Sequence, residues 1–157
     1  MRPALSAVVR SGAGAMQPAR IAALLRSLPG GGRPPDQLRR ELASSLCFGV
    51  FLPAAGGGER QVGYARVVVD SAGTYHLGDV VIDEAFRGRG LGTALVRAVV
   101  SDERLRRRFG TLETENAHRL YEKAGFERCG RERMHRRPHG GCAEKSGEKG
   151  DVGNAAD

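Results

Sequence analysis

The stretch FRGRGLGTALV, residues 86 to 96, decides how the rest of the chain is interpreted. Its glycines alternate with larger residues, two arginines lie among them, and an apolar, helix-like run follows. The first N–H groups of a helix have no intrahelical acceptor, and the helix dipole adds partial positive charge there. Because glycine lets the backbone approach a ligand closely, the stretch predicts a loop that binds a phosphate or pyrophosphate.

The glycine spacing excludes the two commonest nucleotide-binding loops. The dinucleotide fingerprint requires G-x-G-x-x-G, whereas Gly88, Gly90 and Gly92 follow the pattern G-x-G-x-G. The P-loop requires Lys followed by Ser or Thr, and the stretch contains no Lys. A tight turn that needs several residues with positive φ is the purely structural alternative.

The flanking sequence predicts an α/β domain of the α+β-like kind. Three β-rich runs with short turns predict an antiparallel meander before the glycines; they cover residues 46–52, 61–70 and 74–83. Apolar residues at helical spacing predict two short helices before this meander, one helix directly after the glycines and another over residues 117–124. Short strands are predicted over residues 109–114 and 126–130.

One domain is expected, because 157 residues suffice for a single hydrophobic core but not for two domains of usual size. We place it at residues 17–137. Residues 1–16 are expected to be weakly structured, with a first strand over residues 5–10 as the alternative. Residues 138–157 are rich in Gly, Glu, Lys and Ala, have almost nothing to bury, and predict a disordered tail.

The net charge of +7 suits a polyanionic partner. The basic run at residues 104–108 lacks interleaved aromatic residues and any RNP or zinc pattern, so no nucleic-acid partner is expected. No apolar run is long enough to span a bilayer, and no membrane partner is expected.

Cysteine usage and the N-terminus bear on location. The three cysteines are widely spaced and predict neither a disulfide framework nor a metal pair, so a cytoplasmic protein without a metal site is expected. An organelle transit peptide is the alternative, because the start is rich in Arg, Ala and Ser and has no acidic residue before Asp36.

Two motifs together resemble the GNAT (N-acetyltransferase) superfamily. Arg87-x-x-Gly90-x-Gly92, after LGDVVID and before ALVRAVV, resembles the acetyl-CoA loop of that superfamily. AHRLYEKAGF, residues 117 to 126, is similar to its A-x-x-L-Y-E-K-x-G-F segment. The resemblance covers roughly residues 18 to 138. It implies a mixed, mostly antiparallel sheet with a splayed central pair of parallel strands and about four helices.

The resemblance also implies that acetyl-CoA, the cosubstrate, enters a gap between splayed strands at residues 77–82 and 109–114. Loop N–H groups would hold its pyrophosphate; they belong to Arg87, Gly88, Arg89, Gly90, Leu91, Gly92 and Thr93. Backbone groups of three strand residues would bind the pantetheine arm and polarise the thioester carbonyl; these residues are Val80, Val81 and Ile82.

One position departs from the superfamily pattern. Many members carry a cofactor-contacting Asn seven residues before the motif Tyr, where this chain has Thr114, and Asn116 lies two residues later. We keep Thr114 and Asn116 as candidate cofactor contacts. A helix cap is the alternative for Thr114.

The resemblance implies that Tyr121 is the general acid that protonates the leaving thiolate; packing against the sheet is its alternative. Asp79 is the candidate general base, because it is polar within an otherwise apolar strand. A satisfied structural carboxylate and a bend at a β-bulge are the alternatives for Asp79. His76 and His118 are weaker candidates for the base. Glu84 and Glu113 are expected to lie near the cleft.

The expected enzyme is an acetyl-CoA-dependent N-acetyltransferase, in which a primary amine attacks the thioester directly. The acceptor is a small-molecule or peptide amine: small amines, amino acids and a protein N-terminus remain open. The alternative is a non-catalytic regulator of the same fold that binds acyl-CoA. Either a monomer or a homodimer is compatible with the sequence.

Overall fold

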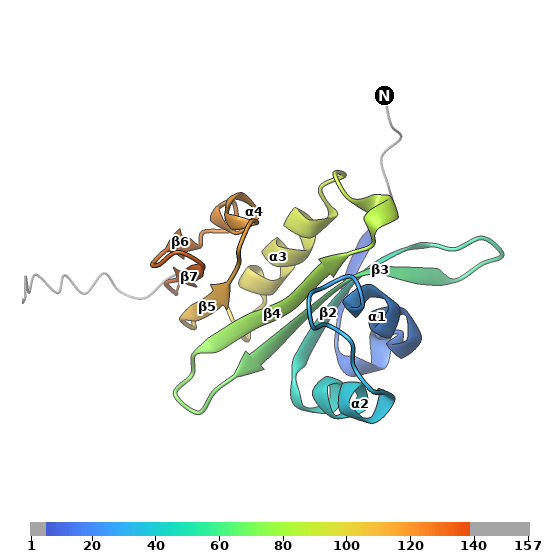
Figure 1. Cartoon of the computed structure of the whole chain (residues 1–157), viewed down its shortest axis with the longest axis horizontal. Coiled ribbons are helices and arrows are strands. Elements are labelled where there is room, and N and C mark those ends of the chain that lie inside the picture. Colours follow the sequence, from blue (N-terminus) through green and yellow to red (C-terminus); the bar gives the residue numbers. More distant parts are fainter. Residues whose placement is uncertain (1–5, 139–157) are drawn as a thin grey trace, which may run out of the picture.

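A computed structural model describes residues 6–138, and one seven-stranded sheet runs through them (Figure 1). Its strands lie in the order β1-β2-β3-β4-β5-β7-β6. They are β1 Val8–Ser11, β2 Leu46–Pro53, β3 Glu59–Val69, β4 Tyr75–Ile82, β5 Gly110–Glu113, β6 Glu127–Arg128 and β7 Arg133–Arg136. Every neighbouring pair is antiparallel except β4 and β5, which are parallel. This confirms the predicted mixed sheet with a central parallel pair.

Four α-helices occur in the described part of the chain: α1 Pro18–Leu25, α2 Pro35–Ser44, α3 Leu91–Ser101 and α4 His118–Glu122. Short 3-10 helices occur at η1 Ala13–Ala15 and η2 Glu84–Phe86. In Figure 1, α1 and α2 lie on one face of the sheet and α3 lies on the other. Within residues 6–138, no helix has the length and apolarity needed to cross a membrane.

Two apolar clusters hold these layers together, one on each face of the sheet. On one face the α3 residues Leu95, Val96 and Val99 are fully buried against the strands. On the other, Ile21 and Leu25 of α1 belong to a second cluster, which also contains residues of α2 and the sheet. Burying apolar surface in this way is the main favourable term in folding. The helical stripes predicted from the sequence are therefore the faces that pack on the sheet.

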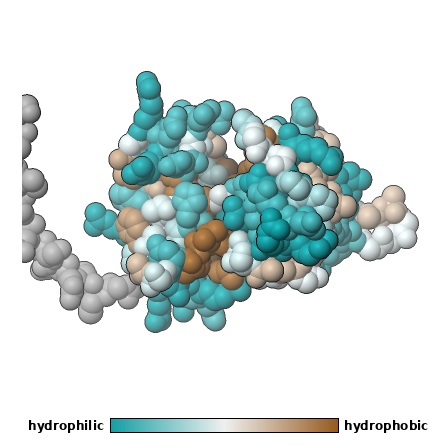
Figure 2. All heavy atoms as spheres, turned by 60° about the horizontal axis from the view of Figure 1, so that its bottom comes forward, coloured by the Kyte–Doolittle hydropathy of each residue, from teal (hydrophilic) through white to brown (hydrophobic). Residues whose placement is uncertain are grey.

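Several element boundaries differ from the sequence expectation. β1 pairs with β2 inside the N-terminal stretch, close to the alternative strand at residues 5–10. The helix predicted at residues 117–124 is shorter in the structure, where α4 covers His118–Glu122. Beyond Pro138, the tail predicted for residues 138–157 lies outside the described residues. The visible surface in Figure 2 is mostly hydrophilic, with small hydrophobic areas.

The loop between α1 and α2 contains a glycine that has no room for a side chain. The amide of Gly31 donates to the carbonyl of Leu28 at 2.9 Å. A Cβ on Gly31 would collide with the backbone carbonyl of Leu25 and lie 3.0 Å from the Leu28 Cβ. A Cβ on the next residue, Gly32, would meet nothing within 4 Å.

This contrast gives a matched pair of variants. We expect Gly31→Ala to lower the free energy of unfolding by about 1–3 kcal/mol, the usual cost of overpacking. Gly32→Ala should leave it unchanged or raise it by about 0.4–1 kcal/mol, because alanine restricts the unfolded chain. Chemical denaturation of both variants measures this. Equal stabilities of the two variants would show that the loop does not pack as described.

Candidate functional site

The sheet opens between its two parallel strands. β4 and β5 pair only at Tyr75↔Gly110 and His76↔Thr111. Beyond these pairs β4 continues to Ile82 without a strand partner on that side within the described residues. The splayed pair predicted at residues 77–82 and 109–114 is therefore confirmed, and one edge of β4 faces the gap.

A β-bulge in β4 lies next to this gap. Tyr64 pairs with Val81 and Arg66 with Gly78, so one residue of β3 faces two residues of β4, Asp79 and Val80. Asp79 has a φ of 52°, and it is the only residue other than glycine with positive φ in the described ranges. A bulge of this kind bends a strand and shifts its side-chain alternation.

The packing shows that the alternation does shift. Leu77 belongs to the apolar cluster on the α3 face, whereas Val81 belongs to the cluster that contains α1 and α2. In an unbroken strand, residues four apart point to the same face. The extra residue at the bulge therefore reverses which side chains of β4 face α3.

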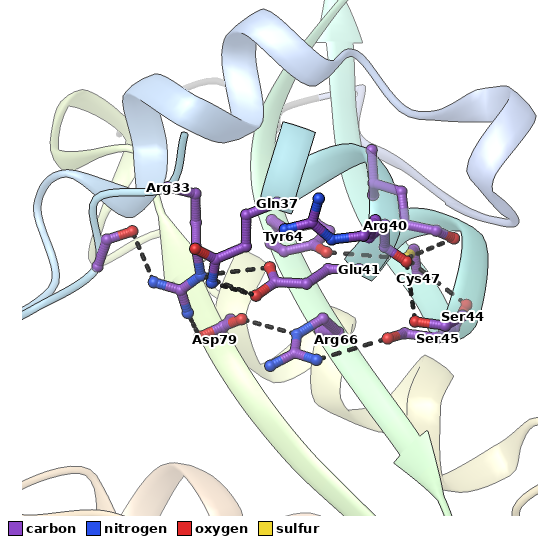
Figure 3. A network of polar contacts seen from close by, with 12 residues as sticks. Arg33, Gln37, Arg40, Glu41, Ser44, Ser45, Cys47, Tyr64, Arg66 and Asp79 are labelled. Atoms are coloured by element: carbon purple, nitrogen blue, oxygen red, sulfur yellow. Dashed lines mark hydrogen bonds and ion pairs between the residues drawn. The ribbon is translucent and has the colours of Figure 1, made fainter. Parts of the chain in front are cut away.

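Ion pairs hold Asp79 in this position (Figure 3). Arg66 Nε donates to one carboxylate oxygen at 2.8 Å, and Arg33 Nη2 donates to the other at 3.1 Å. Arg33 also donates to both carboxylate oxygens of Glu41 and to the carbonyl of Gly31. The network thus joins the α1–α2 loop, α2, β3 and the β4 bulge. The geometry agrees with both alternatives raised for Asp79, a paired carboxylate and a bulge residue.

The glycine loop follows β4 directly and is fixed at its start. Asp83 accepts the amide of Ala85 at 3.0 Å, and its other oxygen accepts from Arg20 Nη2 at 2.9 Å. Gly88 and Gly90 have φ of 77° and 79°, a left-handed conformation that favours glycine. Gly90 is the residue that precedes the first turn of α3.

The amides of this loop are free. Within residues 6–138, no N–H group from Gly88 to Thr93 has a hydrogen-bond acceptor, and the first bond of α3 runs from the amide of Ala94 to the carbonyl of Gly90. A Cβ on Gly88 or Gly90 would lie in open space. A run of unbonded amides at the positive end of an 11-residue helix is suited to binding an anion.

A cavity of about 380 Å³ lies at these amides. It brings together seven of the predicted cofactor residues: Ile82, Arg87, Gly88, Gly90, Leu91, Gly92 and Thr93. Arg87 is tied to the end of β4, since its Nε donates to the Ile82 carbonyl at 3.1 Å. Arg89 does not line the cavity, and its guanidinium carbon lies 6.0 Å from the centre of the Phe86 ring.

The other predicted contacts lie elsewhere. Val80 and Val81 belong to the β4 segment beside the gap, and neither they nor Thr114 and Asn116 line this cavity. The Thr114 hydroxyl accepts the amide of Ala117 at 3.0 Å, so it caps the turn before α4. Asn116 is exposed.

Sequence reasoning missed three residues that line the cavity: Phe86, Leu120 and Lys123. Leu120 and Lys123 lie three residues apart, the spacing that places side chains on one face of a helix. That spacing could have identified them, because both residues belong to the second sequence motif, which contains α4.

Tyr121 is held by the turn that ends α4. The amide of Gly125 donates to the carbonyl of Glu122, and the amide of Phe126 donates to the carbonyl of Tyr121. Gly125 has a φ of 93°, so these bonds form a Schellman motif. The rings of Tyr121 and Phe126 meet edge to face with centres 6.0 Å apart. The motif Y-E-K-A-G-F is thus one structural unit that positions the Tyr121 ring.

The environment of Tyr121 favours its protonated form. Its side chain is buried, with 7% of the residue exposed, and burial raises its pKa to about 12. Within the described residues, its hydroxyl makes no hydrogen bond. The phenol therefore keeps its proton at neutral pH and has that proton free to donate.

The remaining candidates lie apart from the glycine-loop cavity. His76 Nδ1 lies 3.0 Å from the Thr111 hydroxyl, and His118 Nε2 lies 3.0 Å from the Arg131 carbonyl. Glu84 begins η2 and is exposed. Glu113 lies at the end of β5.

Comparison with known proteins identifies relatives of this fold. The sequence model of the acetyltransferase (GNAT) domain matches residues 49–128. A crystal structure from Xanthomonas campestris pv. campestris, assigned to the GNAT acetyltransferases, is 32% identical, with a TM-score of 0.67 over 80% of this chain and 87% of that one. Comparison with curated protein sequences gives no match.

More distant structures share the fold alone. A crystal structure from Klebsiella pneumoniae, assigned as an acyl-CoA N-acyltransferase, is 23% identical. Its TM-score is 0.57 over 83% of this chain and 97% of that one. N-acetylglutamate synthase from Neisseria gonorrhoeae, in complex with coenzyme A and N-acetylglutamate, is 16% identical. Its TM-score is 0.64 over 88% of this chain and 36% of that one.

The buried tyrosines predict an unusual response to alkaline pH. All three tyrosines of the chain are buried, and burial raises the pKa of each above the ordinary value near 10. At about pH 10.5 the folded protein should therefore show little tyrosinate absorbance, whereas the chain unfolded in denaturant should be more than half ionised.

Because the folded state holds these protons more tightly, their stabilising contribution is complete below pH 10. The free energy of unfolding should fall as the pH rises from about 10 through 12. In the Tyr121→Phe variant, the part of the tyrosinate absorbance that rises near pH 12 should disappear. A tyrosine that ionises near pH 10 in the folded protein would contradict the burial described.

Proposed function

The chain belongs to the GNAT acetyltransferase family, and we propose that it is an acetyl-CoA-dependent N-acetyltransferase that acts on a primary amine. The observation that carries this proposal is the run of unbonded amides from Gly88 to Thr93 above the glycine-loop cavity. Such a run is suited to an anionic partner, and the pyrophosphate of coenzyme A is one. Acetyl-CoA supplies an acetyl thioester with a thiolate leaving group.

The residues around the cavity fit such a cosubstrate. Backbone amides and the start of α3 would hold the pyrophosphate, and Arg87 and Lys123 add positive charge beside them. Ile82, Leu91 and Leu120 provide apolar wall along the same cavity. This mixture of apolar wall and a few polar groups is usual in small-molecule sites.

The free edge of β4 offers backbone hydrogen-bonding groups to the cosubstrate. The backbone groups of residues 80–82 have no strand partner on the gap side within the described part of the chain. In our proposal they bind the pantetheine arm, and one N–H group polarises the thioester carbonyl. A donor aimed at developing negative charge contributes several kcal/mol, about 2.7–4 for one oxyanion-hole group.

Tyr121 acts as the general acid in this scheme. The attacking amine forms a bond to the carbonyl carbon, the carbon–sulfur bond breaks, and the Tyr121 hydroxyl protonates the leaving sulfur. The surplus proton on the acylated nitrogen then passes, directly or through water, to the tyrosinate. Its raised pKa supports this role, because the hydroxyl carries its proton throughout the neutral range. General acid catalysis contributes roughly 10²- to 10⁴-fold to a rate.

Asp79 acts as the base that takes a proton from the ammonium group of the acceptor, directly or through water, and so generates the amine that attacks. It lies at the bulge, beside the free edge of β4. Its two arginine contacts fix the carboxylate in place.

Titration with acetyl-CoA, followed by assay of free thiol with a panel of amines, tests the proposed function. We expect saturable binding and amine-dependent release of thiol. Binding without thiol release for any amine would contradict an enzyme and favour the regulator that binds acyl-CoA. Absence of coenzyme binding would contradict both.

Tyr121→Phe removes the acid and keeps the ring. We expect turnover to fall by about 10²- to 10⁴-fold, while the dissociation constant for acetyl-CoA stays within about threefold. Tyr75→Phe is the matched control, because Tyr75 is also buried and lies outside the proposed machinery. Unchanged turnover of Tyr121→Phe at saturating substrates would show that Tyr121 is not the general acid.

Asp79→Asn separates the two roles of this residue. Asparagine tolerates positive φ, so the bulge should persist while the basic group is lost. We expect turnover to fall by about 10²-fold or more with acetyl-CoA binding retained. Arg33→Gln is the control, since it removes the ion pairs of Arg33 with Asp79 and Glu41 and leaves the Asp79 carboxylate. Equal losses in both variants would show that Asp79 acts through its ion pairs.

A further inference from the structure

One half of a sheet face carries polar side chains that no helix packs against. α1 and α2 lie over β2, β3 and the end of β4, and Figure 1 shows no helix over β5 and β7 on that side. Leu77, Leu112 and Met134 point to the α3 face, where they are buried. Because side chains alternate along a strand, their neighbours Glu113 and Arg133 point to the open face.

Two cavities meet on this half of the sheet. One has a volume of about 280 Å³ and is lined by His76, Thr111, Leu112, Glu113 and Arg133. The other, of about 460 Å³, extends past Cys129 to Arg131 and is also lined by Glu113 and Arg133. We call the two together the β5–β7 groove. Its combined size is suited to a small molecule.

The groove lies beside the point where the parallel strands separate. His76 and Thr111 form the last β4–β5 pair, and Glu113 follows two residues later on β5. The groove therefore opens next to the splayed edge of β4, where the proposed function places the thioester. An amine bound in the groove would lie beside that thioester.

Glu113 and Arg133 are opposite in charge and directly opposite in register, yet they do not pair. They face each other across the antiparallel strands β5 and β7. Side chains in such positions are close enough to interact, and unlike charges usually do so. Here neither forms an ion pair or a side-chain hydrogen bond with any residue from 6 to 138.

In the half of this face that α1 and α2 cover, three arginines are paired with carboxylates. Arg66 and Arg33 contact Asp79, and Arg20 contacts Asp83. The β5–β7 groove is thus a place where a carboxylate and a guanidinium both remain available. A ligand that carries an ammonium and a carboxylate group would satisfy both.

We propose that the β5–β7 groove is the acceptor site and that the acceptor is a free amino acid. Glu113 accepts hydrogen bonds from its ammonium group, and Arg133 binds its carboxylate through two parallel N–H bonds. This inference rests on the proposed function. A simple amine or a peptide N-terminus lacks the adjacent carboxylate and leaves Arg133 without a partner.

The first test compares each standard L-amino acid with its own α-carboxamide in the thiol-release assay. The amide keeps the shape and the amine but removes the negative charge. We expect at least one amino acid to react with a kcat/KM about 10- to 100-fold above that of its amide, the loss typical of a charge-assisted hydrogen bond. Amides that react as well as their acids would overturn the inference and leave the acetyltransferase function intact.

The second test uses variants of the groove. Arg133→Gln should raise KM for the amino acid about 10-fold or more and leave KM for its amide unchanged, and Arg133→Lys should recover part of the loss. Glu113→Gln should raise KM for both acceptors. Arg97→Gln and Glu103→Gln are matched controls, because both residues are exposed and lie outside the groove. Equal effects of Arg133→Gln on acid and amide would contradict the assignment.

Cys129 provides a readout that does not depend on catalysis. It is exposed and lines the groove, whereas Cys47 is buried. Alkylation of Cys129, followed by peptide mass spectrometry without coenzyme A, should slow in the presence of the preferred amino acid but not of its amide. Protection without any thiol release would keep the binding site and reject the enzyme. No protection by any amino acid would overturn the site.

Discussion

The bulge at Asp79 is the constraint on which the rest of the site depends. A residue with a side chain at positive φ costs of order 1–3 kcal/mol, and here two arginines bond to that side chain. The extra residue reverses the alternation of side chains along β4, so Val81 packs toward α1. Beyond the pair His76↔Thr111, β4 no longer pairs with β5. Arg33 brings the α1–α2 loop into the same network. The bulge thus lies between the last β4–β5 pair and the loop after β4, and the network at Asp79 ties it to the α1–α2 loop.

The glycine loop and α4 use the gap in complementary ways. The loop presents amides without a protein acceptor at the positive end of α3, where they are free to bind an anion. The Schellman turn after α4 buries the Tyr121 ring and leaves its hydroxyl without a partner within the described residues. One motif therefore presents free donors, and the other presents a buried tyrosine that keeps its proton and that does not itself line the glycine-loop cavity. Each motif is short, because each depends on local backbone geometry.

That locality explains what could be predicted from the sequence. Glycine spacing and apolar periodicity are local signals, and they predicted the meander and the loop. The splayed strands and the candidate Tyr121 followed from the family resemblance, which two short local motifs carry. The partners of Asp79 could not be predicted, since Arg33 lies 46 residues away in the chain. The pairing of Glu113 with Arg133 across β5 and β7 depends on strand register, which periodicity does not specify. The sequence leaves both a helix cap and a cofactor contact open for Thr114, because both would use the same hydroxyl.

The proposed function requires that the loop amides and the free edge of β4 bind acetyl-CoA. Amide hydrogen exchange, followed residue by residue with and without saturating acetyl-CoA, detects this contact. We expect marked slowing at residues 88–93 and at 80–82, with unchanged exchange in the hairpin turn between β2 and β3. Binding of acetyl-CoA that left the exchange of residues 88–93 unaltered would show that the coenzyme binds elsewhere.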